Sequence, residues 1–382
     1  MKPTLIKRFL LIFLSLAVCL LSSCIAWGPT LEDLERYDEL SKNQAEDSEV
    51  ESNASNASSE AESSESGNES AILGDKTMTV HFIDVGQGDS IFIELPNGEC
   101  MLIDAGERDY AGKVVSLIDC LGYTKIDYIV ATHPHSDHIG GMQRVIESFD
   151  IGKVYMPEAI NDTSTFYNLL EAIDAKGLGV TAVTAGLTAD FGGASGVFVS
   201  PTAIVDNLNS CSAVLRLSYG DRAFLFTGDI ESDAEATVKL DVSCDVLKVA
   251  HHGSYTSSSD AFLKRTGAEY AVISCGTDNE YGHPHDAALN RLKKNGIEKI
   301  YRTDISGSIT ITTDGSNLKL QEGTEIEGYV WVLNLGNKKF HRADCNSAVE
   351  MNPVNKAYSK RSIEELLRQG YAPCGSCKPD KE

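Results

Sequence analysis

The chain has 382 residues and a formal net charge of −23, with 56 acidic and 33 basic side chains. A single hydrophobic core stops growing at roughly 250–300 residues, so this length predicts one large domain with smaller accessories. The acidic balance argues against a surface that binds nucleic acid through a general excess of positive charge. Of the ten cysteines, those in the middle of the chain are expected to be buried free thiols rather than disulfides: Cys100, Cys120, Cys211, Cys244 and Cys275.

The first 24 residues have the composition of an export signal. Basic residues precede an apolar run over residues 9–21, which is shorter than the ~20 residues that a membrane span requires. The run ends in Leu21-Ser22-Ser23-Cys24, which resembles a bacterial lipobox. The resemblance implies that Cys24 is lipidated and that its acyl chains hold the protein on the extracellular face of the bacterial cytoplasmic membrane. The alternative is an ordinary cleaved signal with a stray cysteine.

Residues 25–75 are predicted to be a disordered acidic linker. Between residues 29 and 75 there are 14 acidic and 2 basic side chains and one aromatic residue, in a background of Ser, Asn and Ala. Such a segment buries too little apolar surface to offset the conformational entropy lost on folding. We therefore expect a tether between the membrane and the folded region.

The main folded region, residues 76–328, opens with alternating apolar residues. They predict strands over residues 77–85, 90–95 and 100–104. The turn Gly86-Gln87-Gly88-Asp89 joins the first two, and its glycines permit positive φ angles and a close approach of the backbone. Strand-like and helix-like segments then alternate, with a helix expected over residues 233–240.

The densest set of candidate ligands follows a strand predicted over residues 126–131. His133, His135, Asp137 and His138 lie within six residues. Imidazole and carboxylate ligands suit zinc, manganese or iron better than calcium, and a strand end can hold them rigidly while they face a cleft. The pattern predicts a metal centre that activates water. The alternative, solvated loop histidines, does not account for four ligands at this density.

This histidine motif resembles the signature of the metallo-β-lactamase superfamily. The earlier stretch from His81 to Ser90 resembles the opening of the metallo-hydrolase domain in the ComEC competence proteins, and the resemblance covers about residues 77–322. The family implies an α/β fold, the four-layer αββα sandwich, with two divalent metals, zinc or manganese. In that family the first two histidines bind one metal, and the residues matching Asp137 and His138 bind the second.

The resemblance also implies roles for residues further along the chain. Asp229, which follows a predicted strand in Thr-Gly-Asp, is the expected bridge between the two metals. His251 is the preferred last ligand of the second metal. His252 and His283 are expected to face the substrate phosphate as catalytic groups together with Asp137, although the roles of the three histidines could be exchanged.

The chain departs from the family pattern before the strand that leads to Asp229. Many members have a third histidine for the first metal there, whereas residues 206–212 contain none. Asn209 is a candidate weak ligand or water holder, so the first site is expected to be oxygen-rich and more tolerant of manganese. The number of bound metals is therefore left open.

Residues 329–382 form a separate, mildly basic piece with 9 basic and 6 acidic side chains. His341, Cys345, Cys374 and Cys377 give one ligand pair at each end, which is typical of a structural zinc site with no open position. The set resembles the metal-binding domain of the Ada repair protein, with His341 in place of the first cysteine. A redox pair at Cys374 and Cys377 is the alternative, but the matching upstream pair favours zinc.

The resemblance implies a lipid-anchored extracellular nuclease or phosphodiesterase that acts on DNA, with a C-terminal module that contacts DNA or a partner. No nucleotide cofactor is expected, and the oligomeric state is not predicted. One alternative is a phosphodiesterase that acts on another substrate of the cell envelope. A second is a metal-stabilised protein that binds DNA or a surface partner without turnover, which the acidic charge and the missing third histidine favour.

Overall fold

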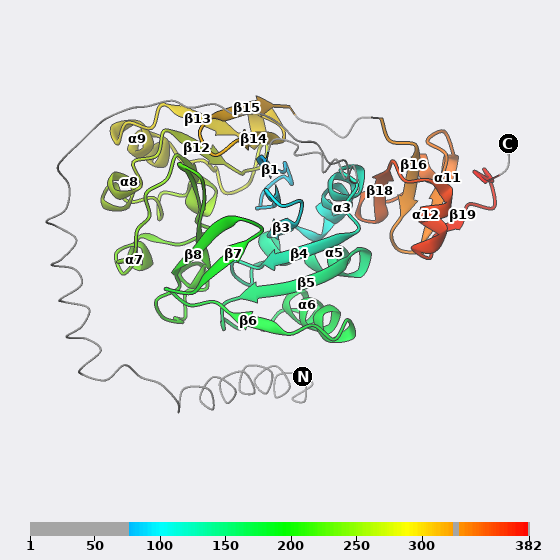
Figure 1. Ribbon diagram of the computed structural model, residues 1–382, viewed down its shortest axis with the longest axis horizontal. Helices are drawn as coiled ribbons and strands as arrows, with labels where there is room; N and C mark the ends of the chain where they lie inside the picture. The colour runs from blue at the N-terminus through cyan, green and yellow to red at the C-terminus, as the bar shows by residue number, and fades with distance from the viewer. Residues whose placement is uncertain (1–75, 324–327, 381–382) are drawn as a thin grey trace, which may run out of the picture. The chain divides into compact units, whose positions relative to one another are not determined.

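The computed structural model describes residues 76–323 and 328–380, and the predicted signal and linker lie outside them. The described residues belong to one compact unit. They form two large β-sheets flanked by helices and a small third sheet near the C-terminus (Figure 1). In this part of the chain, no helix combines the length and the apolar character needed to cross a membrane.

The first sheet has eight strands in the order β15-β14-β1-β2-β3-β4-β5-β6. They are β1 (Met78–Phe82), β2 (Ile91–Glu94), β3 (Cys100–Ile103), β4 (Lys125–Val130), β5 (Asp150–Met156), β6 (Val180–Ala182), β14 (Ile309–Thr313) and β15 (Leu318–Glu322). Strands β3 to β6 run parallel. In the turn between β1 and β2, a Cβ at Gly88 (φ 143°) would lie 2.3 Å from the carbonyl oxygen of Asp137. Glycine is therefore required where this turn meets the histidine motif.

The second sheet has seven strands in the order β13-β12-β11-β10-β9-β8-β7. They are β7 (Thr188–Phe191), β8 (Ala194–Ser200), β9 (Val214–Tyr219), β10 (Arg222–Phe226), β11 (Val246–Lys248), β12 (Tyr270–Ile273) and β13 (Lys299–Arg302). Strands β10 to β13 run parallel. Both sheets therefore contain parallel strands whose carboxyl ends can carry functional loops.

The two large sheets pack face to face because alternate residues of a strand point to opposite sides. Phe224 and Phe226 of β10 share a buried core with Val80 and Phe82 of β1. Leu225, between the two phenylalanines, enters a second core instead. The strands that end at the histidine motif and at Asp229 are thus held between packed layers, which gives these loops rigid bases.

Helices cover the outer sides of both sheets (Figure 1). The first sheet is flanked by α3 (Ala111–Cys120), α5 (Met142–Ser148) and α6 (Ser164–Ala175), and the second by α8 (Asp260–Thr266) and α9 (Asp286–Lys294). The shorter helices are η1 (Arg108–Tyr110), α4 (Ser136–Ile139), η2 (Asn209–Cys211), α7 (Ser232–Glu235), η3 (Ala250–Gly253) and α10 (Thr303–Ser306). This layering confirms the predicted α/β fold, with sheets flanked by helices.

The helix predicted over residues 233–240 is wrong in length, because α7 ends at Glu235. The guanidinium of Arg265 donates to the backbone carbonyls of Val238 (2.8 Å) and Leu240 (2.7 Å). These two carbonyls therefore accept hydrogen bonds from a side chain of a neighbouring helix instead of from N–H groups of a longer α7. The local sequence pattern does not show this contact with a distant segment.

The cysteines in the middle of the chain are free thiols, and all except the half-buried Cys120 are buried. Burial raises the pKa of the Cys100 and Cys275 thiols to about 12. Very little thiolate exists at neutral pH under these conditions, so these side chains act as small apolar groups.

The C-terminal module contains a sheet in the order β18-β16-β17-β19. Its elements are β16 (Trp331–Asn334), β17 (Lys339–His341), α11 (Asn346–Val349), η4 (Pro353–Asn355), β18 (Lys356–Ser359), α12 (Ile363–Arg368) and β19 (Ala372–Pro373). The module packs against α3: a Cβ at Gly112 would lie 2.0 Å from the carbonyl oxygen of Lys356. Arg361 also forms a buried ion pair with Asp119 of α3. The C-terminal module and helix α3, which flanks the first sheet, therefore share a buried interface.

Candidate metal centre

The candidate ligands lie on loops that follow the carboxyl ends of strands. The histidine motif follows β4, Asp229 follows β10, His251 and His252 follow β11, and His283 lies between β12 and α9. Ligand sites in open α/β sheets are commonly built at such strand ends. The loops enclose a cleft of about 500 Å³, lined by Gln87, His135, Ser136, Asp137, Asn161, Thr163, Thr165, Asn209, Asp229, His251, His252, Tyr281 and His283.

Four side chains converge around one position in this cleft. Asp137, His138, Asp229 and His252 each offer a ligand atom, and these atoms lie within 4.8 Å of one another. The Nε2 of His138 is 3.2 Å from Asp229 Oδ1, and the Nε2 of His252 is 3.1 Å from Asp137 Oδ2. Two carboxylates and two imidazoles make a donor set that suits zinc or manganese.

The outer nitrogens of the two imidazoles are fixed by acceptors. The Nδ1 of His138 lies 2.7 Å from Asp104 Oδ2, and the Nδ1 of His252 donates to the carbonyl oxygen of Ser274 (2.9 Å). Because a carbonyl oxygen can only accept, Nδ1 of His252 carries a proton, and Nε2 is the nitrogen directed to the cleft that could bind a metal. Histidines that ligate metals in proteins are usually held in this way.

The electrostatics of the group fit a divalent cation. Burial opposes protonation of His138 and His252, but Asp229 and the neighbouring carboxylates outweigh it and raise the pKa of both rings well above the ordinary value. Burial would also raise the pKa of Asp229, but His138 and His252 hold it well below the ordinary value. The Nε2 of His138 and Oδ1 of Asp229 are buried and, although 3.2 Å apart, make no hydrogen bond. The four side chains of this group favour the protonated form of their imidazoles and leave ligand atoms without hydrogen bonds. Both features are expected of a site that binds a metal cation.

A second set of nitrogens lies next to the first, near Oδ2 of Asp229. The Nε2 of His133 is 3.0 Å from Nδ1 of His135 and 4.0 Å from Asp229 Oδ2. Burial, with the nearby His138, lowers the pKa of His133 well below the ordinary value, so this ring is neutral and able to ligate. Asp229 thus lies within reach of both sets, as a bridging carboxylate would.

The structure places His252, rather than the preferred His251, in the four-atom group. Both residues have φ 52°, and their rings diverge: His252 joins the four-atom group, whereas Nε2 of His251 lies 3.4 Å from Asn209 Nδ2 and 3.9 Å from Asp229 Oδ2. Its Nδ1 is 3.4 Å from Glu231 Oε1. His251 therefore lies outside the four-atom group and beside Asn209, where the sequence lacks a third histidine. The sequence does not indicate which of two adjacent histidines points to the metal site. Their side-chain directions depend on the left-handed backbone at both residues.

His283 lines the cleft, as predicted, and its tautomer is set by Gln87. The backbone N–H of Gly276 donates to Gln87 Oε1 (3.2 Å), which leaves the amide Nε2 3.3 Å from Nδ1 of His283. The amide nitrogen can only donate, so Nδ1 of His283 accepts and its Nε2 carries a proton. Burial and the neighbouring His252 and His251 lower the pKa of His283 to about 4. A neutral imidazole with an N–H donor therefore lines the cleft.

Two residues behind the group were not predicted. The ammonium of Lys248 and the carboxylate of Asp89 form a buried ion pair. Asp89 Oδ1 lies 3.4 Å from Nδ1 of His252, and the backbone N–H of Asp89 donates to the carbonyl oxygen of Asp137 (3.1 Å). A signal was present, because Lys248 is the single charge in the apolar run over residues 246–250. A charge in a buried strand requires a partner.

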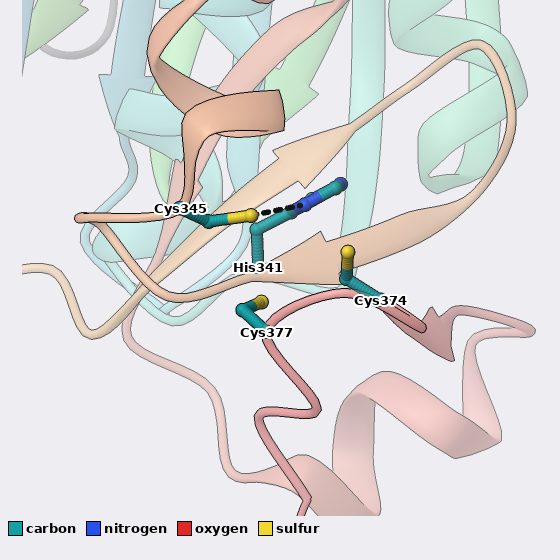
Figure 2. Close-up of side chains that lie close together, drawn as sticks. All are labelled: His341, Cys345, Cys374 and Cys377. Carbon is teal, nitrogen blue, oxygen red and sulfur yellow. Dashed lines mark hydrogen bonds between the residues drawn. The ribbon is translucent and has the colours of Figure 1, made fainter.

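The predicted C-terminal ligands also converge (Figure 2). His341 ends β17, Cys345 precedes α11, and Cys374 and Cys377 follow β19. Cys345 Sγ lies 3.6 Å from Nδ1 of His341, whose Nε2 is buried without a hydrogen-bond partner. Burial opposes ionisation of Cys374, but backbone N–H groups of Cys377 and Ser376 outweigh it and lower its pKa to about 7. One imidazole and three thiols, one of them readily ionised, fit a tetrahedral metal site.

Comparisons with known proteins match most of the large domain. The family model described as "Metallo-beta-lactamase superfamily" matches residues 83–277, about half of the chain. ComE operon protein 3 of Bacillus subtilis (strain 168) is 28% identical over 60% of this chain and 32% of its own length. Competence protein ComA of Neisseria gonorrhoeae is 32% identical over 62% of this chain and 33% of its own length. The chain thus spans about a third of these relatives.

Among solved structures, the metallo-beta-lactamase fold protein YhfI from Bacillus subtilis is similar with a TM-score of 0.43 and 14% identity, over 62% of this chain and 100% of that chain. The family match includes the histidine motif, Asp229 and the two histidines that follow β11. The chain belongs to the metallo-β-lactamase superfamily.

Proposed function

We propose that the protein is a metal-dependent phosphodiesterase that cleaves DNA. The observation that carries the proposal is the meeting of two ligand sets at Asp229. Nε2 of His138 lies 3.2 Å from one carboxylate oxygen, and Nε2 of His133 lies 4.0 Å from the other. A carboxylate placed between two sets of nitrogens suits a pair of divalent ions, which is an arrangement used for phosphodiester hydrolysis.

The two proposed ions share Asp229 and otherwise have separate ligands. Asp137, His138, Asp229 and His252 would hold one ion, and the nitrogens of His133, His135 and His251 with Asp229 would hold the other. We propose zinc or manganese, because imidazole and carboxylate ligands suit both. When bound, such ions lower the pKa of water and stabilise charge on phosphate oxygens.

The side chains of the cleft would bind and orient the substrate. The Nε2–H of His283, fixed by Gln87, can donate a hydrogen bond to a phosphate oxygen or to the departing oxygen. The amide of Asn161 is held in place by the carbonyl oxygen of Pro134, to which its Nδ2 donates (2.8 Å). These groups are neutral donors and acceptors, which position a phosphodiester without adding charge to the site.

The choice of DNA as substrate is supported by a relative that bears the name "Competence protein ComA". The resemblance of residues 21–24 to a lipobox supports a location on the outer face of the cytoplasmic membrane, where DNA from outside would be met. The same location would also offer other phosphodiesters of the cell envelope as substrates.

We propose that the C-terminal module binds one structural zinc and contributes to DNA binding. Its residues 329–382 carry 9 basic and 6 acidic side chains, whereas residues 76–328 carry 19 basic and 36 acidic ones. Lys339 and Lys378 are exposed beside the zinc ligands. The module is therefore the better candidate for contact with a phosphate backbone.

The experiment is a cleavage assay of the purified chain on plasmid DNA and short oligonucleotides, with a panel of divalent ions and with a chelator. The proposal expects cleavage that requires manganese or zinc and stops when the ion is removed. Retention of DNA without any cleavage would instead support a binding protein. Hydrolysis of small phosphodiesters but not of DNA would support another envelope substrate.

A further inference from the structure

We propose that Tyr281 and Tyr255 form a stacking site for unpaired nucleobases beside the cleft, so that single-stranded DNA is bound in preference to duplex. The inference deepens the proposed function and rests on it for its substrate. Tyr281 lines the same cleft as Asp137 and Asp229. A base held by Tyr281 would therefore place its own strand beside the candidate metal ligands.

The two tyrosines are strongly exposed and are connected by histidine rings. Tyr281 is 67% exposed and Tyr255 is 62% exposed. The ring of Tyr281 stacks on His283 at 5.6 Å with an interplanar angle of 19°. His283 lies 4.9 Å from His285, which lies 5.0 Å from the ring of Tyr255. A continuous row of rings therefore leads out of the cleft.

Hydrogen bonds hold both tyrosines on ordered loops. The side chain of Asn279 donates to the carbonyls of Gly276 (2.8 Å) and His283 (2.6 Å) and accepts from the backbone N–H of His283 (2.9 Å), which clamps the loop that carries Tyr281. The carbonyl of Tyr255 accepts from the guanidinium of Arg291 (3.0 Å). A surface that is already ordered loses less entropy when it binds. Tyr281 stacks on His283 with one face, and its high exposure leaves ring surface available to a partner.

The charge around the cleft favours base stacking, rather than attraction of the phosphate backbone, as the main source of DNA affinity there. Among the described residues that line the cleft, none is a lysine or an arginine, and residues 76–328 carry 36 acidic against 19 basic side chains. Electrostatic attraction of a phosphate backbone, which dominates most DNA binding, is therefore weak at this position. Stacking on an aromatic ring does not depend on charge and changes affinity by about 5- to 150-fold per base.

The same geometry disfavours duplex DNA. In a duplex, both faces of each internal base are covered by neighbouring base pairs, so a tyrosine gains a partner only if the base is first unstacked. Bases of a flexible single strand can reach an exposed ring without that cost. The preference for single strands thus follows from the exposed rings of Tyr281 and Tyr255.

The test is equilibrium binding of fluorescent oligonucleotides to the full chain. A thymidine oligonucleotide with phosphorothioate linkages is compared with an abasic oligonucleotide of the same length and charge, and with the corresponding duplex. We expect the thymidine strand to bind at least about 5-fold more tightly than the other two. Tyr281→Ala should remove most of this difference, Tyr281→Phe should keep it because the ring remains, and adding Tyr255→Ala should weaken binding further.

The inference would be overturned by equal affinity of the wild-type chain for the thymidine and abasic strands, or by unchanged binding of the thymidine strand by Tyr281→Ala. Loss of affinity for both strands to the same extent would also contradict it, because stacking acts only on bases. Cleavage of an ordinary phosphodiester strand is measured separately. Base-dependent binding that needs Tyr281, without metal-dependent cleavage, would uphold the stacking site and refute the hydrolase.

Discussion

The ammonium of Lys248 lies 2.6 Å from the carboxylate of Asp89, and their side chains are 0% and 2% exposed. The pair lies directly behind the candidate metal centre, since Asp89 also contacts the ring of His252 and the backbone of Asp137. Burial would raise the pKa of Asp89, but Lys248 and His252 outweigh it and keep its pKa below the ordinary value. The ion pair thereby joins β11 to the turn between β1 and β2, which is in turn hydrogen-bonded to the histidine motif.

Replacing Lys248 by methionine should destabilise the fold strongly. The carboxylate of Asp89 would stay buried without its partner, and breaking a buried pair in this way costs about 3–5 kcal/mol of unfolding free energy. Urea denaturation followed by circular dichroism measures the loss. Lys294→Met is the matched control, because Lys294 pairs with Asp260 on the surface, with side chains 70% and 47% exposed. An equally small effect of both substitutions would contradict the structural role of the buried pair.

His252 and His251 should differ in their effect on metal binding. His252→Ala removes a nitrogen from the four-atom group, so it should lower the affinity for one manganese ion by more than about 100-fold, beyond the effect of losing an outer-shell partner. His251→Ala should leave that ion in place and weaken the ion on the His133 side. Calorimetric titration with manganese gives both affinities. If instead His251→Ala abolished the tighter site and His252→Ala spared it, the original assignment of His251 to the second metal would be restored.

Local patterns predicted the strands and the dense cluster of candidate ligands, and the resemblance of these motifs to a known family implied the layered fold. The histidine motif lies within six residues, and the spacing of Phe224 and Phe226, two residues apart in β10, can be read from the sequence. The resemblance to a known family then indicated Asp229, which lies far along the chain.

What the sequence could not supply depends on contacts between distant segments. The directions of His251 and His252 follow from left-handed backbone angles. The pairing of Asp89 with Lys248 joins the turn between β1 and β2 to β11 of the other sheet, so neither residue reveals the other in the sequence. The packing of Arg361 against Asp119, which joins the C-terminal module to α3, likewise has no local signature.

Removal of zinc should unfold the C-terminal module first. A module of roughly 50 residues has a small core, so metal bound by His341, Cys345, Cys374 and Cys377 would supply much of its folding free energy. Cys374→Ser should therefore abolish binding of one equivalent of zinc and expose the module to proteolysis, while the large domain stays protected. Zinc content by elemental analysis, with limited proteolysis, measures both effects. Cys244→Ser, at a buried thiol outside the module, is the control for zinc content. Unchanged zinc content in Cys374→Ser would refute the structural zinc site.

Cys24→Ser should change the location of the protein. If Cys24 carries the lipid, the serine variant has no acyl anchor and is either released from membranes or retained as an uncleaved precursor. Fractionation of membranes and immunoblotting distinguish these products by location and size. A fully processed variant that stays on the membrane as well as the wild type would show that another feature anchors the chain.

The most direct test of the account is the rate of DNA cleavage by the wild-type chain and by Asp137→Ala, measured with manganese or zinc. The carboxylate of Asp137 lies 3.1 Å from Nε2 of His252 and its side chain is 27% exposed, so it belongs to the proposed site and reaches the cleft. Losing it should reduce metal-dependent cleavage to background while circular dichroism shows an intact fold. Undiminished cleavage by a folded Asp137→Ala protein would contradict the proposed metal centre.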